Sequence, residues 1–126
     1  MAHNAGFLAL VNDAKSRIRE VDIAGYRDLV STAAATGASE IVLVDVREDR
    51  EWDAGHAAGA IHLGKGIIER DIESKIPEKD RQIVLYCGGG FRSALVADNL
   101  QKMGYTGVIS LDGGWTAWRS AGLPTE

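Results

Sequence analysis

A single cysteine, Cys87, begins a loop whose residue types are suited to holding a negatively charged sulfur atom. The residues that follow it are Gly88, Gly89, Gly90, Phe91, Arg92 and Ser93. Three successive glycines let the backbone turn so that several N–H groups point at one centre, and the guanidinium of Arg92 adds a positive charge. Because both kinds of group favour thiolate over thiol, we expect Cys87 to ionise readily and to act as a nucleophile.

The alternative interpretation is that Cys87 is a buried structural cysteine and that the glycines only form a turn. A single cysteine excludes an intramolecular disulfide and a metal site built from several cysteines. His3 and His62 have no ligand spacing with each other or with Cys87, so we expect no metal centre. Three glycines and an arginine between a strand pattern and a helix pattern favour the reactive interpretation.

Two hydrophobic patterns indicate where this loop lies in the fold. Residues 83–86 form a short unbroken apolar run, which is typical of a strand buried on both faces. Val96, Leu100 and Met103 recur at helical spacing, and Gly104 suits the position just after the end of a helix. The loop should therefore join the carboxyl end of a strand to a helix N-terminus, where backbone N–H groups bind anions.

Similar patterns predict the rest of the fold. Further strand-like runs cover residues 41–44, 60–63 and 108–111. Helical stripes cover residues 7–18, 26–33 after a candidate N-cap at Asp22, and 67–76 before Pro77. This alternation predicts an α/β protein with a mainly parallel sheet of about five strands and helices on both faces. We place one domain at residues 20–126 and an N-terminal helical extension at residues 1–19.

Composition limits the classes of function. The chain has 126 residues, of which 45% are hydrophobic and 25% charged, as expected for one globular domain. A formal net charge of -4 gives no overall electrostatic attraction to nucleic acid or to an anionic membrane. No apolar stretch is long enough to span a bilayer, and the N-terminus lacks the pattern of a secretory signal. We therefore expect a cytoplasmic protein.

Asp45 and Arg47 follow the apolar run at 41–44, so they should lie near the same edge of the sheet as Cys87. They could help to position the active loop. Arg47 could equally form a structural ion pair with Glu48 or Glu51, and we favour this structural role.

Three segments together resemble the single-domain rhodaneses, a family of sulfurtransferases. The pattern Cys-x-x-Gly-x-Arg, formed by Cys87, Gly90 and Arg92, is similar to the active-site loop of that family. Residues 45–48, Glu51, 55–56 and 59–61 are similar to its upstream signature, and residues 111–115 with Trp118 to its C-terminal one. The resemblance runs from about residue 21 to residue 124 and leaves the N-terminal helix outside.

The resemblance implies the rhodanese fold and sulfur transfer through a Cys87 persulfide, with residues 88–93 binding the substrate. The donor would be a small sulfur-containing anion such as thiosulfate, and the acceptor a thiol, cyanide or a partner protein. No metal and no organic cofactor would be needed. Gly88 stands where thiosulfate-preferring members often carry a basic side chain. The family pattern also makes His56 a loop brace, and we expect Trp115 and Trp118 to be core residues.

Three other functions remain open. The active-site loops of cysteine phosphatases and arsenate reductases resemble Cys-x5-Arg, whereas only four residues lie between Cys87 and Arg92. We therefore rank phosphatase or arsenate reductase activity second. A persulfide carrier that serves only a protein partner is a further alternative, and a regulatory domain without activity is a third. Phe91 either anchors the loop to the core or shapes the donor pocket.

Overall fold

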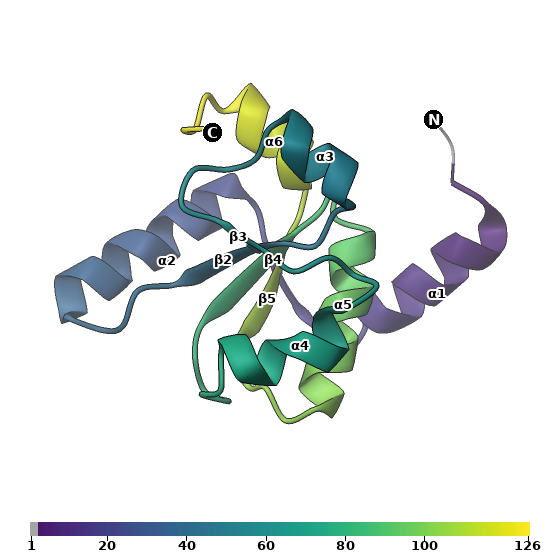
Figure 1. Ribbon diagram of the computed structural model, residues 1–126, viewed down its shortest axis with the longest axis horizontal. Helices are drawn as coiled ribbons and strands as arrows, with labels where there is room; N and C mark the ends of the chain where they lie inside the picture. Colours follow the sequence, from purple (N-terminus) through teal and green to yellow (C-terminus); the bar gives the residue numbers. More distant parts are fainter. Residues whose placement is uncertain (1–2) are drawn as a thin grey trace.

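A five-stranded sheet runs through the middle of the protein (Figure 1). The computed structural model describes residues 3–126. The strands are β1 (Arg19–Val21), β2 (Val42–Asp45), β3 (Ile61–His62), β4 (Ile83–Tyr86) and β5 (Val108–Leu111). The helices are α1 (Ala5–Lys15), α2 (Ile23–Thr36), α3 (Asp49–Ala54), α4 (Ile68–Lys75), α5 (Arg92–Lys102) and α6 (Gly114–Ser120).

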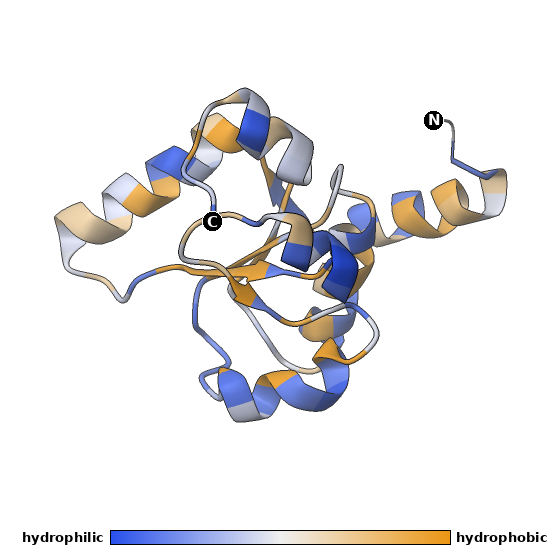
Figure 2. Ribbon diagram, turned by 45° about the horizontal axis from the view of Figure 1, so that its top comes forward, coloured by the Kyte–Doolittle hydropathy of each residue, from blue (hydrophilic) through white to orange (hydrophobic). Residues whose placement is uncertain are grey.

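All strand pairs are parallel, and the order across the sheet is β1-β5-β4-β2-β3. The central strand β4 is buried along its whole length, because apolar side chains point from it into a core on each face. One core lies under α4 and α5, and the other lies under α2 and α6. Figure 2 shows hydrophobic residues along the strands inside the molecule and mostly hydrophilic residues on the outer helix α4. The predicted α/β class, with helices on both faces of a parallel sheet, is confirmed.

The four apolar runs predicted as strands match β2, β3, β4 and β5 to within a residue or two. The fifth strand, β1, had no assigned position in the sequence; it pairs with β5 at the edge of the sheet. The predicted N-cap of α2 is confirmed, since an Asp22 side-chain oxygen accepts a hydrogen bond from the Gly25 amide at 2.8 Å. Gly104 has a φ of 101°, as the residue after α5 requires.

The N-terminal helix α1 packs against α5 at the end of the molecule opposite α2 (Figure 1). It ends at Lys15, three residues earlier than the periodicity predicts, and Ile18 packs on the core beyond the helix. The division of the chain at residues 19 and 20 stays a prediction, and the first two residues of the predicted extension lie outside the described range. Among residues 3–126, no helix has the length and apolarity needed to cross a bilayer.

Candidate active site

Two backbone amides converge on the sulfur of Cys87. The residue follows β4 directly, and its Sγ accepts hydrogen bonds from the N–H of Gly90 at 3.2 Å and of Ser93 at 3.4 Å. The Ser93 hydroxyl lies 3.5 Å from the same sulfur. Cys87 is only 1% exposed, but these donors turn toward its thiol. The predicted cradle is therefore present in part: of the three glycines, only Gly90 directs its amide at the sulfur, and the Ser93 amide joins it.

The N-terminus of α6 fixes the backbone of this loop. The amide of Trp115 donates to the Cys87 carbonyl at 2.7 Å, and the amide of Thr116 donates to the Gly88 carbonyl at 3.1 Å. Amides in the first turn of a helix have no partner within the helix, so the loop carbonyls satisfy them. The amides of Gly88 and Gly89 donate to no acceptor within the described chain, and both residues line the opening above Cys87.

A buried hydroxyl pair supports the loop from the sheet. The Ser93 hydroxyl lies 2.8 Å from the hydroxyl of Ser110 on β5, and neither side chain is exposed to solvent. This pair orients the Ser93 hydroxyl at the sulfur of Cys87. The sequence analysis did not identify Ser110, because a serine within an apolar strand gives no functional signal by itself.

Arg92 is held by a carboxylate. Its guanidinium donates two hydrogen bonds to Glu51 of α3, at 2.7 and 3.1 Å. The hydrogen bond from Arg92 lowers the pKa of Glu51 from 4.5 to about 2, and the pair raises the pKa of Arg92. The sequence predicts that the positive charge of Arg92 acts on the Cys87 thiolate. In the structure, Glu51 neutralises part of that charge.

Asp45 and Arg47 form a buried ion pair of their own. The closest contact joins Arg47 Nη2 and Asp45 Oδ2 at 2.7 Å, and the same nitrogen donates to the Gly55 carbonyl at 2.7 Å. The prediction that Arg47 pairs with Glu48 or Glu51 is wrong, because the Arg47 guanidinium pairs with Asp45, whose side chain also accepts a hydrogen bond from the Arg47 amide at 2.8 Å. These contacts tie the end of β2 to the loop after α3, which is the structural role favoured from the sequence.

His56 connects α3 with Glu126. Its Nδ1 lies 3.2 Å from the Trp52 carbonyl, and its Nε2 lies 3.3 Å from a carboxylate oxygen of Glu126. The imidazole stacks on the Trp52 ring with the centroids 3.4 Å apart. Trp118 is buried, as expected of a core residue, whereas Trp115 is partly exposed and stacks with the Arg47 guanidinium.

A cavity of about 400 Å³ opens above the cysteine. Its lining consists of His3, Phe7, Cys87, Gly88, Gly89, Phe91 and Arg92. The Phe91 ring lines this cavity and packs on Phe7 of α1, and it is not among the side chains of either core. Of the predicted loop residues, all but Gly90 and Ser93 line this opening, and those two direct their amides at the sulfur instead. The N-terminal segment adds two aromatic side chains that the sequence analysis had not connected with the site.

Known proteins resemble this chain in sequence. The profile of the family described as Rhodanese-like domain matches residues 29–121. An uncharacterized protein of Synechocystis is 38% identical over 86 residues, or 68% of this chain and 46% of that protein. Thiosulfate sulfurtransferase GlpE of Pseudoalteromonas translucida is 34% identical over 82 residues, or 65% of this chain and 76% of the relative. The chain thus spans less than half the length of the Synechocystis relative.

A solved structure from Rhodopseudomonas palustris matches the fold with a TM-score of 0.78 and 34% identity, covering 100% of this chain and 98% of the other. It is described as a protein of unknown function and possible tyrosine phosphatase. The family match covers β2 to β5 and the cysteine loop between β4 and α5, which is the part of the molecule that forms the sulfur cradle. This chain belongs to the rhodanese-like domain family.

Proposed function

We propose that this protein is a sulfurtransferase that carries a sulfane sulfur on Cys87. The observation that supports the proposal most directly is the convergence of the Gly90 and Ser93 amides on Sγ, at 3.2 and 3.4 Å. The cradle lies in a Cys-x-x-Gly-x-Arg loop within a rhodanese-like domain, and a relative in that family is named thiosulfate sulfurtransferase. A nucleophilic thiolate held by amide donors is what the first step of sulfur transfer needs.

In that step the Cys87 thiolate attacks the outer sulfur of thiosulfate. The sulfur–sulfur bond of the donor breaks, sulfite leaves with the bonding electron pair, and a new bond joins the transferred sulfur to Sγ. The resulting persulfide is an anion one atom longer than the thiolate. The free amides of Gly88 and Gly89 are candidates to hold the added sulfur, and Arg92 is the candidate to attract the anionic donor.

In the second step an acceptor nucleophile attacks the outer sulfur. The persulfide bond breaks, its electron pair returns to Sγ as a thiolate, and the acceptor leaves with the sulfur. Cyanide would give thiocyanate, a thiol would give a new persulfide, and a partner protein could accept the sulfur on its own cysteine. Neither step requires a metal or an organic cofactor.

The proposal is tested by intact mass spectrometry after incubation with thiosulfate. We expect a gain of one sulfur atom, its loss on addition of cyanide, and no gain in Cys87→Ala. A persulfide that forms but is passed slowly to cyanide and rapidly to a protein thiol would assign the carrier function instead. A wild-type protein that takes up no sulfur from any sulfane-sulfur donor would contradict both.

Phosphatase activity is the second candidate, because the Rhodopseudomonas palustris structure is described as a possible tyrosine phosphatase. The short loop argues against it. Four residues separate Cys87 from Arg92, one fewer than in the Cys-x5-Arg loop that encloses a tetrahedral oxyanion. Release of phosphate from an aryl phosphate, together with no sulfur uptake, would establish the phosphatase.

A further inference from the structure

The N-terminal segment forms one wall of the cavity above Cys87. The imidazole of His3 packs on the Phe91 ring with centroids 4.3 Å apart, and the Phe7 ring lies 6.3 Å from Phe91 and 5.3 Å from His3. These three rings and Cys87 line the same opening. The aromatic wall therefore comes from two segments more than 80 positions apart in the sequence.

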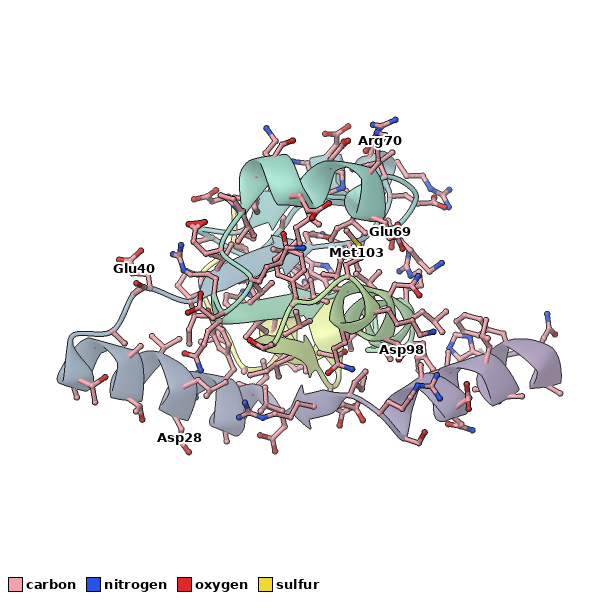
Figure 3. All side chains as sticks on the ribbon, turned by 90° about the horizontal axis from the view of Figure 1, so that it is seen from below. Asp28, Glu40, Glu69, Arg70, Asp98 and Met103 are labelled. Atoms are coloured by element: carbon pink, nitrogen blue, oxygen red, sulfur yellow. The ribbon has the colours of Figure 1, made fainter. Side chains whose placement is uncertain are left out.

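Helix α1 is anchored well enough to keep this wall in place. Val11 and Ala14 are buried, and Arg17, just after the helix, donates two hydrogen bonds to Asp98 of α5, at 2.8 and 3.0 Å. The Arg17 carbonyl accepts from the side chain of Gln101 at 2.9 Å. Figure 3 shows Asp98 on α5 beside α1. Contacts on both α1 and the turn after it hold the wall against the domain.

The charge of the opening suits a ligand with less charge than thiosulfate. Among the described residues, Arg92 is the only Lys, Arg, Asp or Glu side chain in the lining, and Glu51 occupies its guanidinium with two hydrogen bonds. Lys15 lies beside the wall with its Nζ 5.3 Å from the Phe91 ring centroid, and it is paired with Glu20 at 3.4 Å. A small, strongly hydrated dianion would gain little from aromatic walls and would meet a charge that is already partly neutralised. A ligand with one negative charge beside an aromatic or hydrocarbon group would use both parts of the cavity.

We propose that the cavity binds the organic part of a sulfane-sulfur donor, a thiosulfonate-like monoanion that carries an aromatic or other apolar group. Phe7 of α1 and His3, just before that helix, are the specificity-determining residues of the N-terminal segment, and they act together with Phe91 of the catalytic loop. The α1 segment lies outside the residues 29–121 matched by the family profile, so this wall is a feature of the chain beyond the family core. The inference rests on the proposed sulfur transfer through Cys87.

With an aryl thiosulfonate, the Cys87 thiolate attacks the terminal sulfur of the donor. The bond between that sulfur and the sulfonyl sulfur breaks, and the aryl sulfinate leaves with the electron pair. The product on the protein is the same persulfide that thiosulfate would give. Donors that differ only in their organic group therefore report on the cavity and share one chemical step.

The test compares benzenethiosulfonate with methanethiosulfonate as donors, at saturating acceptor. Each kcat/KM is divided by the rate of the same donor with a free small thiol, which removes the difference in leaving-group reactivity. We expect the wild type to prefer the phenyl donor by roughly 10-fold, and Phe7→Ala to lower that preference by about 3- to 10-fold, mainly through KM. Phe7→Leu, which keeps an apolar side chain, should retain part of the preference.

Leu10→Ala is the matched control, because Leu10 lies on the same helix with its side chain 57% exposed and outside the cavity lining. It should leave the preference unchanged. Equal normalised rates for the two donors in the wild type would overturn the inference and leave sulfur transfer intact, and so would a phenyl preference that Phe7→Ala does not reduce. Failure of every donor to load Cys87 would instead overturn the proposed function.

Discussion

Arg92 connects the catalytic loop to α3, and the strength of that connection sets how much charge it offers to a substrate. Glu51 receives both hydrogen bonds from the guanidinium, and both side chains are about one-third exposed. The carboxylate competes with an anionic donor for the same N–H groups. Capture of a dianion should therefore improve when the competing charge is removed.

We predict that Glu51→Gln lowers the KM for thiosulfate by about fivefold, since an ion pair this exposed contributes about 1 kcal/mol. Glutamine keeps the capping interaction of Glu51 at the start of α3, so the helix should persist. Glu73→Gln removes an equal charge from the surface pair with Lys79 and serves as the control. Steady-state kinetics with cyanide as acceptor measures the effect, and an unchanged or higher KM in Glu51→Gln would contradict it.

The same pair predicts a pH dependence of stability. Hydrogen bonding to Arg92 lowers the pKa of Glu51 from 4.5 to about 2, so its contribution to folding is fully present above pH 4.5. The contribution is lost as the pH falls from 4.5 toward 2, because the folded state must then give up the charged carboxylate. Urea unfolding should show the wild type more stable than Glu51→Gln at pH 7, and the two should converge near pH 2. A difference that stays constant with pH would refute this assignment.

The sequence identified the residues that lie close together along the chain and missed those brought together by the fold. Cys87 and its loop could be found because six consecutive residues carry the signal. Glu51 and Arg92 are 41 positions apart, and Ser93 and Ser110 are 17 apart, so their pairing depends on how α3 and β5 are placed. Side-chain pairs between elements that are far apart along the chain produce no periodic pattern in the sequence.

The helices and strands also differ in how well the sequence predicts them. Runs of four apolar residues predicted the buried strands, whereas β1 has only three residues, of which Arg19 and Glu20 are exposed. Its pairing with β5 determines its structure more than its composition does. Helix α3 has six residues, too few to show helical periodicity, although Glu48 and Glu51 form a capping box at its start.

The contact between α6 and the catalytic loop can be tested by substitution of Gly114. Gly114 begins α6 with a φ of 49°, and a Cβ there would overlap the Cys87 carbonyl oxygen. We predict that Gly114→Ala destabilises the protein by ~2–4 kcal/mol, from the backbone conformation and the overlap together. Gly122→Ala is the control for the backbone cost alone, because Gly122 has a φ of 71° and open space around it.

Thermal or urea unfolding measures both variants. Gly122→Ala should lose only about 1 kcal/mol, and the remaining difference reports the contact between α6 and the loop. The Gly114→Ala variant should also form its persulfide more slowly, since relief of the overlap displaces the Cys87 carbonyl. Equal destabilisation by the two substitutions would show that the contact between Gly114 and the loop contributes nothing.

Across the whole molecule, α1 lies outside the matched family residues but forms part of the wall around Cys87. Arg17 holds this segment in place by forming an ion pair with the largely buried carboxylate of Asp98. We predict that Arg17→Ala loosens α1 and opens the cavity, so that iodoacetamide alkylates Cys87 several-fold faster than in the wild type. Intact mass spectrometry over time gives the rate.

Arg70→Ala is the matched control, since Arg70 pairs with its neighbour Asp71 on the exposed face of α4, far from α1 in Figure 3. That variant should react at the wild-type rate. If Arg17→Ala also reacts at the wild-type rate, then access to the sulfur is set by the loop alone and the wall from α1 does not limit it. Faster alkylation confined to Arg17→Ala would mean that a segment added to the rhodanese-like core regulates which molecules reach its cysteine.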